Sequence, residues 1–153
     1  MGLALEEARK AAALGEVPVG AVVARNGEVV AAAHTPARPK KTHCIMQSCW
    51  PLMPPAKAGR LAAVGVRAVR HAGACPMCAG AIINSRIRRV VYGAADTKAG
   101  CCGSVTDLFA MPFNHHPVVE QGLRAEEAQE LLQTFFKDLR ARLAARPKWK
   151  PSV

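Results

Sequence analysis

The middle of this 153-residue chain lacks acidic side chains: no aspartate or glutamate occurs between Glu28 and Asp96. Residues 34–74 hold seven lysines and arginines, so this one segment accounts for seven of the ten net positive charges. Such a concentration of positive charge is typical of a protein with an anionic partner. The absence of carboxylates excludes a general acid or base of that type from this part of the chain.

Long apolar runs and aromatic residues are also scarce. No run is long enough to cross a bilayer, and an N-terminus with Glu6 and Glu7 is not typical of a signal peptide. We therefore expect a cytoplasmic protein, in which the six cysteines serve metal or redox chemistry rather than disulfides. Aromatic residues make up 5% of the chain, which predicts an aliphatic, alanine-rich core. The length suits a single domain over residues 1–145, followed by a basic tail over residues 146–153.

The N-terminal part of the sequence predicts a helix followed by a tight hairpin. Over residues 2–14 apolar side chains repeat at helical spacing, at Leu3, Leu5, Ala8, Ala12 and Ala13. The apolar run 17–23 is typical of a buried strand, Asn26-Gly27 of a hairpin turn, and residues 28–32 of the returning strand. A helix and a hairpin in this order open an α/β or α+β domain.

Residues 34–74 carry no sustained periodicity. Five prolines forbid a long helix there: Pro36, Pro39, Pro51, Pro54 and Pro55. We expect residues 35–63 to be irregular and residues 64–70 to form a short strand. An insert of this length without structure is unusual in a compact domain, and its simplest interpretation is a long basic loop.

Regular structure is predicted again from residue 75 onward. We expect a helix over residues 76–84, a strand over residues 88–93, a short helix capped by Ser104 and a short strand at residues 118–119. The clearest helix covers residues 125–145. Its apolar face is formed by Ala128, Leu131, Leu132, Phe135, Phe136, Leu139 and Leu143. We assign the two phenylalanines of that face to the core.

Cys75 and Cys78 form the pattern around which the chain is organised. A helix that begins at Pro76 directs both sulfurs toward one point near its N-terminus, where the helix dipole and the unpaired N–H groups favour thiolates. Thiolates at this spacing are typical zinc ligands. The alternatives are a redox pair or inert core thiols. The adjacent pair Cys101-Cys102 is expected to be structural rather than bridged.

Further motifs lie on both sides of the basic segment. In order they are Gly15–Val23, Cys75–Ile82, Arg86-Ile87, Val90–Ala94, Asp96, Lys98, Gly100, Gly103-Ser104, Asn114-His115 and Phe135-Phe136. In order and spacing these runs resemble bacterial tRNA-specific adenosine deaminases of the cytidine-deaminase-like superfamily. The resemblance covers residues 3–33 and 75–145. It implies an α/β fold, a three-layer α/β/α arrangement around a central mixed sheet of five strands, and a homodimer that forms near the active site.

The resemblance also implies a reaction and a cofactor. In this family one histidine and two cysteines hold Zn²⁺ and leave the fourth position to a water molecule, whose pKa the metal lowers. A glutamate that is not a ligand moves the proton of that water, C6 of adenine is attacked, ammonia leaves, and inosine remains in an unpaired tRNA anticodon loop. By this resemblance Cys75 and Cys78 are zinc ligands, and Asp96, Lys98 and Asn114 bind the substrate. Solvated turns are the alternative for those last three.

The sequence departs from the family where its His-Ala-Glu motif is expected. That motif is absent, so no catalytic residue is identifiable. His43 lies two positions before the expected ligand and is the candidate third zinc ligand, with an exposed loop histidine as the alternative. Weaker candidates for the same role are His34, His71, Cys44 and Cys49.

A shifted reading frame accounts for this departure. Read one base later, the codons for residues 59–73 permit the family's missing strand and its terminal Leu-Glu. Read two bases later, the codons for residues 41–51 permit Asp-Pro-x-x-His-Ala, although not the glutamate. We therefore interpret residues from about 35 to 74 as out-of-frame translation.

Three functions follow from these observations. The first is a tRNA adenosine deaminase that makes inosine at the wobble position. The second is a catalytically inactive relative that binds zinc or RNA, which the missing motif favours. The third is a deaminase of free guanine or cytosine, which the loop at Asp96 and Lys98 and the long C-terminal helix disfavour.

Overall fold

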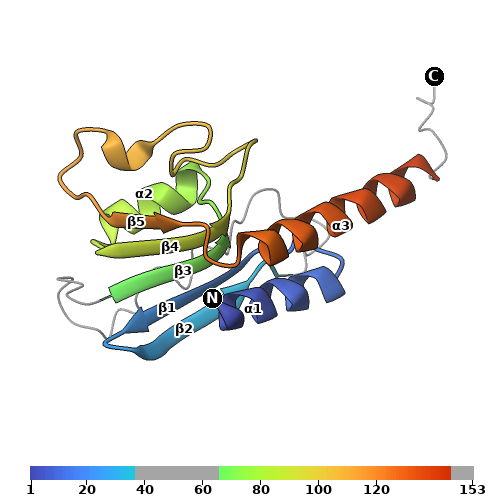
Figure 1. Ribbon diagram of the computed structural model, residues 1–153, viewed down its shortest axis with the longest axis horizontal. Helices are drawn as coiled ribbons and strands as arrows, with labels where there is room; N and C mark the ends of the chain where they lie inside the picture. Colours follow the sequence, from blue (N-terminus) through green and yellow to red (C-terminus); the bar gives the residue numbers. More distant parts are fainter. Residues whose placement is uncertain (37–65, 146–153) are drawn as a thin grey trace, which may run out of the picture.

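A computed structural model describes residues 1–36 and 66–145, with side chains placed for residues 1–36 and 72–145. The elements are α1 (Gly2–Ala13), β1 (Gly20–Arg25), β2 (Glu28–His34), β3 (Val66–Ala72), α2 (Pro76–Asn84), β4 (Arg89–Ala94), η2 (Leu108–Ala110), β5 (Val118–Gln121) and α3 (Ala125–Ala144). Five strands form one sheet in the order β2-β1-β3-β4-β5 (Figure 1). Strand β1 is antiparallel to β2 and β3, whereas β3, β4 and β5 are mutually parallel.

Helices cover the two faces of this mixed sheet. Leu5 of α1 and Ala128 of α3 share one buried cluster with Ala94 of β4. Ile82 of α2 belongs to a second cluster, which it shares with Tyr92 of β4. The predicted α/β fold, with a central mixed sheet between helical layers, is therefore confirmed. Within the described ranges, no helix combines the length and hydropathy needed to cross a membrane.

The first hairpin forms where the sequence predicts it. Asn26 and Gly27 connect β1 to β2 with positive φ angles of 51° and 90°. Two successive positive φ angles are the requirement of the turns that match the twist of paired strands, and asparagine followed by glycine meets it at low cost.

The predicted short strand at residues 64–70 forms as β3, two residues further along the chain. It lies at the centre of the sheet, where Val22 of β1 and Val91 of β4 both pair with Val69. Residues 37–65 lie outside the described residues, and so does most of the segment 35–63 that we expected to be irregular. The part of the basic segment that is described therefore supplies the middle of the sheet.

The buried face of α1 differs from the predicted one. The buried residues are Ala4, Leu5, Ala8 and Ala11, whereas Leu3 and Ala13 are exposed and Ala12 is half-buried. The reason is the close approach of α1 to β1, because a Cβ atom on Gly20 would lie 2.0 Å from the Ala4 carbonyl oxygen. Only the face lined with alanine allows two backbones to come so close.

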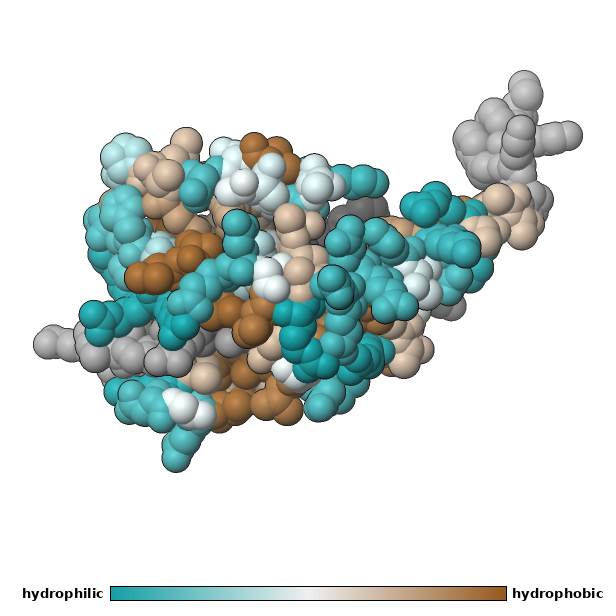
Figure 2. All heavy atoms as spheres, in the orientation of Figure 1, coloured by the Kyte–Doolittle hydropathy of each residue, from teal (hydrophilic) through white to brown (hydrophobic). Residues whose placement is uncertain are grey.

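Helix α3 buries less of its apolar face than the sequence predicts. Ala128 and Phe135 are buried, but Phe136 and Leu143 are 38% and 51% exposed, so assigning Phe136 to the core was wrong. The C-terminal half of α3 extends beyond the sheet, where no strand can cover it (Figure 1). In Figure 2 this projecting part is coloured mostly as hydrophilic or neutral.

The short helix η2 is capped by Asp107 rather than by Ser104. The Phe109 N–H donates to the Asp107 carboxylate over 2.9 Å. Asp107 directly precedes the helix, where a side-chain oxygen can reach the first free N–H groups. Ser104 instead donates its hydroxyl proton to the Asp96 carbonyl oxygen over 2.8 Å.

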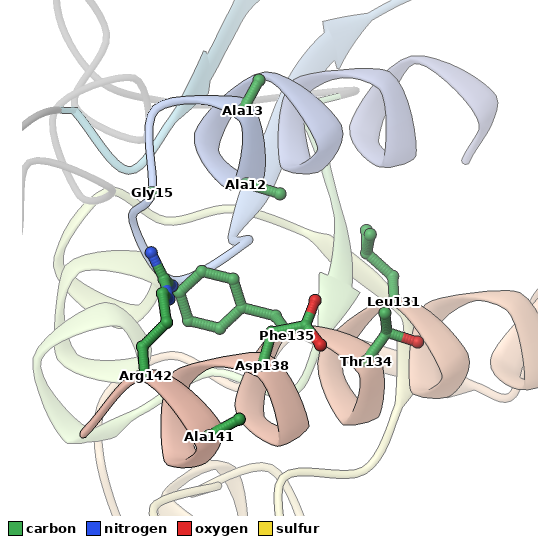
Figure 3. Close-up of a pocket in the computed structure, with 9 residues that line it drawn as sticks. All are labelled: Ala12, Ala13, Gly15, Leu131, Thr134, Phe135, Asp138, Ala141 and Arg142. Carbon is green, nitrogen blue, oxygen red and sulfur yellow. The ribbon is translucent and has the colours of Figure 1, made fainter. Parts of the chain in front are cut away.

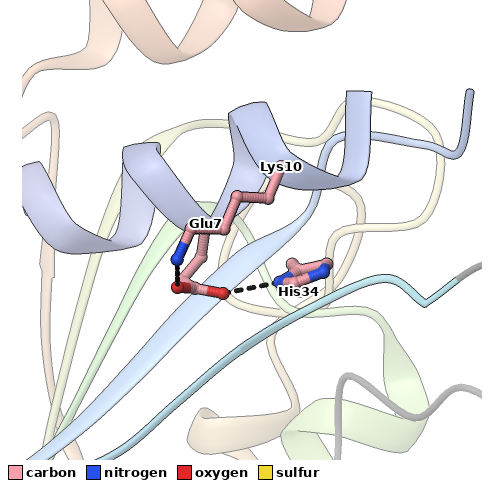
Figure 4. A network of polar contacts seen from close by, with 3 residues as sticks. All are labelled: Glu7, Lys10 and His34. Atoms are coloured by element: carbon pink, nitrogen blue, oxygen red, sulfur yellow. Dashed lines mark hydrogen bonds and ion pairs between the residues drawn. The ribbon is translucent and has the colours of Figure 1, made fainter. Parts of the chain in front are cut away.

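A polar cluster ties α1 to the end of β2. The Glu7 carboxylate accepts from Lys10 Nζ over 2.6 Å and lies 2.5 Å from Nδ1 of His34 (Figure 4). Hydrogen bonding by Lys10, and then by His34, holds the pKa of the Glu7 carboxyl below its ordinary value of 4.5.

Replacing Glu7 by glutamine is expected to lower the free energy of unfolding by about 1 kcal/mol at pH 7. A lowered folded-state pKa stabilises the protein above the unfolded pKa, and this contribution is lost as the pH falls through the folded value. The difference between the two proteins in urea unfolding should therefore shrink as the pH falls below 4.5 and vanish once the pH is below the folded-state pKa. Glu6→Gln on the exposed side of α1 is the control and should change little. An equal loss for Glu7→Gln at acidic and neutral pH would contradict this explanation.

Candidate metal centre

The two cysteines of the motif lie at the N-terminus of α2. Cys75 is the N-cap residue with φ −70° and ψ 170°, and Pro76 occupies the first turn. Proline suits this position because it has the φ of a helix and lacks the N–H that would have no partner. Cys75 is half-buried, Cys78 is fully buried, and their Sγ atoms are 3.4 Å apart.

This pair of sulfurs fits a zinc ion. Zn–S bonds of about 2.3 Å at tetrahedral angles separate two sulfurs by about 3.8 Å, a few tenths of an ångström more than the distance between Cys75 and Cys78. A small side-chain rotation closes this difference. The positive end of the α2 dipole also favours the thiolate forms that zinc needs. The donor set and its geometry are therefore those of half a zinc site.

The other half is not among the described residues. Within residues 1–36 and 72–145, no three histidine, cysteine or acidic side chains are grouped as a metal site would require. His34, one of the weaker candidates, contacts Glu7 instead. His43, Cys44 and Cys49 lie outside the described residues, as does the side chain of His71.

The loop after β4 carries Asp96 and Lys98, which the resemblance assigns to substrate binding. The Asp96 carboxylate accepts the backbone N–H groups of Lys98 and Ala99 over 2.9 and 3.1 Å. Its carbonyl oxygen accepts the Gly100 N–H over 3.0 Å. One carboxylate oxygen of Asp96 thus closes a tight turn, while the Lys98 side chain is exposed to solvent.

This loop lies directly against the residues that precede Cys75. The Gly73 N–H donates to the Ala94 carbonyl over 3.0 Å, and the Cys101 N–H donates to the Ala74 carbonyl over 2.7 Å. The fold therefore brings the loop that carries Asp96 and Lys98 next to the metal-binding end of α2. The sequence separates these groups by some twenty residues.

Asn114 lies in the loop between η2 and β5 and contacts Arg86, which follows the other end of α2. Its carbonyl oxygen accepts from Arg86 Nη1 over 2.7 Å, just beyond the C-terminal end of the helix. The cysteines lie at the N-terminal end, about 13 Å away along a helix of nine residues. The structure thus joins the Asp96 loop to the cysteines, and places the main chain of Asn114 at the opposite end of α2.

The buried side chain of Tyr92 was not predicted to belong to the site. It is 2% exposed, and its hydroxyl contacts the Cys102 carbonyl oxygen over 2.9 Å and Gln121 Oε1 over 2.8 Å. Burial raises the pKa of the Tyr92 phenol, and the nearby Cys102 and Asp107 raise it further. The sequence did contain a signal for this residue, because Tyr92 is the single tyrosine of the chain and lies in an apolar strand. A phenol that is buried there needs a polar partner.

A groove of about 640 Å³ lies away from these residues, between the C-terminal end of α1 and α3 (Figure 3). Phe135 forms part of its wall, and Asp138 and Arg142 lie on its α3 side. None of the predicted zinc-binding or substrate-binding residues lines it. We therefore do not assign the reaction to this groove.

The sequence matches known protein families over most of its length. Residues 1–94 match the cytidine and deoxycytidylate deaminase zinc-binding region, and residues 69–140 match MafB19-like deaminases. Zinc is therefore the cofactor of this chain.

Individual relatives agree with this assignment. A tRNA-specific adenosine deaminase of Bacillus subtilis is 37% identical over 147 residues, covering 95% of this chain and 91% of that protein. Another tRNA-specific adenosine deaminase, of Agrobacterium fabrum, is 36% identical over 148 residues, covering 92% of this chain and 93% of that protein. A tRNA(Ile)-lysidine synthase of Deinococcus deserti is 37% identical over 151 residues. That match takes in 96% of this chain but only 28% of the synthase.

Solved structures give the same result. A chain from work on A-to-I editing by tRNA:A34 deaminases at the wobble position of transfer RNA is 32% identical, with a TM-score of 0.65, covering 86% of this chain and 97% of that one. Guanine deaminase from Nitrosomonas europaea, at 23% identity and a TM-score of 0.60, shares the fold over 88% and 81% of the two chains. With two paired cysteines at the start of α2 in a deaminase fold, this chain belongs to the zinc-dependent tRNA-specific adenosine deaminase family.

Proposed function

We propose that this protein hydrolyses adenosine to inosine at the wobble position of tRNA. The observation that carries the proposal is the pair of cysteine sulfurs at the start of α2, 3.4 Å apart, with the Asp96 loop hydrogen-bonded to Ala74, the residue before them. Relatives whose names specify a tRNA adenosine deaminase support the choice of substrate. The net charge of +10 suits a polyanionic partner.

Each candidate residue has a proposed role. Cys75 and Cys78 would hold the zinc, with His43 as the third ligand. Zinc, when bound, supplies Lewis-acid activation of a water molecule. Lys98, exposed at the tip of the Asp96 turn, would contact a phosphate of the anticodon loop, while Asp96 and Asn114 would orient the target nucleotide.

A second candidate function is a catalytically inactive relative that binds zinc and RNA. The observation that favours it is the missing His-Ala-Glu motif, because the glutamate of that motif is the family's proton carrier. Loss of a positioned general acid or base slows a reaction by about 10²- to 10⁴-fold. An inactive chain would keep its cysteines and its basic surface.

A deamination assay separates these functions. An anticodon stem-loop with adenosine at the wobble position would be incubated with two zinc-loaded proteins. One is the chain as it stands, and the other is a frame-restored protein in which residues 35–74 follow the shifted frames and the glutamate of the His-Ala-Glu motif is added. We expect inosine from the frame-restored protein, and about 10²- to 10⁴-fold less from the chain as it stands. A stem-loop with guanosine at that position is the control. If neither zinc-loaded protein forms inosine, the proposed reaction is wrong.

The basic segment itself calls for a separate test. We propose that residues from about 35 to 74 arise from a shifted frame within a single domain of residues 1–145, with residues 146–153 as a basic tail. Sequencing the gene across the codons for residues 33–76 decides this. An intact frame, together with peptides containing Trp50 and Arg60 in mass spectra, would exclude a sequence error.

Two further properties belong to the same proposal. A tRNA substrate implies a cytoplasmic location. The family resemblance implies a homodimer formed near the active site, which sedimentation at micromolar concentrations would detect as twice the mass of one chain.

A further inference from the structure

A path of hydrogen bonds and main-chain bonds leads from the edge of the sheet to Cys75. It starts at Gln121 of β5, whose amide lies 2.8 Å from the hydroxyl of Tyr92 on β4. The same hydroxyl donates to the Cys102 carbonyl oxygen over 2.9 Å. One residue earlier, the Cys101 N–H donates to the Ala74 carbonyl over 2.7 Å, and Ala74 directly precedes Cys75.

Each partner in this path has a defined role. The Cys102 carbonyl can only accept, so the single phenolic proton of Tyr92 goes to it. Gln121 completes the pair when its amide turns to donate an N–H to the phenol oxygen. Tyr92 and Gln121 are paired residues on adjacent parallel strands, so the position of the hydroxyl is set by the sheet. The phenol is thus an anchor point within the sheet.

The loop between this anchor and Cys75 has little freedom to absorb a change. At Gly100 a Cβ atom would lie 2.1 Å from Ser104 Oγ and 2.5 Å from the Asp96 carbonyl oxygen. Cys101 and Cys102 are buried. The main chain of Cys102 also pairs with that of Asp107, just before η2, in an isolated antiparallel β-bridge. A displacement at Cys102 would therefore be passed on to Cys101 and to the Ala74 carbonyl.

We propose that Tyr92 is a positioning residue for the metal centre, which holds Cys75 at the N-cap of α2 through Cys101, Cys102 and Ala74. The inference rests on Cys75 as a zinc ligand, as in the proposed function. The helix dipole orients neither sulfur, whereas the backbone before Cys75 sets the direction in which its Sγ points. Groups that orient a metal ligand typically contribute 10- to 100-fold, as an order of magnitude, to metal affinity.

The test is zinc affinity in the absence of RNA, measured for the full chain by competition with a chromophoric chelator. Tyr92→Phe keeps the ring and removes the hydroxyl, and we expect about ten-fold weaker zinc binding. The cobalt-loaded variant should also show shifted d–d bands, because one thiolate no longer points at the metal as before. Val91→Ala, on the same strand but outside the path, is the matched control and should keep the affinity and the spectrum.

Several results would overturn the inference. One is a Tyr92→Phe protein with zinc affinity within about two-fold of the unaltered chain. Another is a cobalt complex of the unaltered chain without a thiolate charge-transfer band, since Cys75 would then not be a ligand. If Tyr92→Phe does not fold, Gln121→Leu at the exposed sheet edge decides, with a loss of about three-fold expected and no loss overturning the inference. A normal cobalt spectrum of the frame-restored protein, without inosine formation by that protein, would contradict the proposed reaction alone.

Discussion

Replacing Cys78 by serine is expected to abolish zinc binding and, with it, deamination. Cys78 is fully buried at the first turn of α2, and its sulfur is 3.4 Å from that of Cys75. A serine hydroxyl stays protonated at neutral pH and is a poor zinc ligand, so one of the two described donors is lost. We expect zinc affinity to fall by more than about 100-fold, beyond the effect of losing a supporting residue. Metal content and competition with a chelator measure this loss.

Cys101→Ser is the matched control for this variant. Cys101 is also a buried cysteine, but its Sγ lies 3.6 Å from the Ala99 carbonyl oxygen, a contact that a serine hydroxyl can replace. The control should therefore bind zinc as the unaltered chain does. Equal losses in both variants would mean that buried thiols stabilise the fold and do not hold the metal. Inosine formation in the frame-restored protein should follow zinc content in the same order.

Replacing Gly20 by alanine is expected to destabilise the fold by about 3 kcal/mol, at the upper end of the cost of overpacking. The new methyl group would lie 2.0 Å from the Ala4 carbonyl oxygen and 2.5 Å from the Ala8 backbone nitrogen. Both contacts are with the backbone of α1, which cannot move aside as a flexible side chain would. Helix α1 must therefore shift away from β1 and expose buried alanines. The midpoint and slope of urea unfolding measure the change.

Gly80→Ala provides the opposite result at a second glycine. Apart from its chain neighbours and the helix's own backbone, nothing lies within 4 Å of the Cβ position at Gly80, which is in the middle of α2. Alanine is favoured over glycine in a helix interior, so this variant should gain about 1 kcal/mol. Gly80 lies two residues from Cys78. If the variant keeps its zinc affinity, the gain in stability does not come from the metal site. A Gly20→Ala protein as stable as the unaltered chain would refute the close packing of α1 on β1.

Local patterns in the sequence were enough to predict most of the fold. The helix at residues 76–84 follows from Pro76 at its start, and the turn at Asn26-Gly27 from the positive φ angles that this dipeptide tolerates. Both depend on backbone preferences of a few adjacent residues. The family assignment likewise depends on motifs that can be quoted in order along the chain, and the comparisons confirm it.

The errors arose where burial depends on distant elements. Phe136 has the helical spacing of a core residue, but the adjacent Phe135 takes the buried side of α3, and Phe136 stays 38% exposed. In α1 the periodicity allowed two adjacent faces. The contact at Gly20 selected the face with Ala4 and Ala8, because that face has the least bulk.

The sequence by itself determined which groups this protein has for its chemistry: Cys75 and Cys78 at helical spacing, and no carboxylate between Glu28 and Asp96. Only the tertiary structure decided what stands beside them. It joins the Asp96 loop to Ala74 and connects both to Tyr92, because β3 and β4 end side by side in a parallel pair. Such contacts depend on which strands are neighbours, and strand order arises from the packing of the whole sheet rather than from any local pattern.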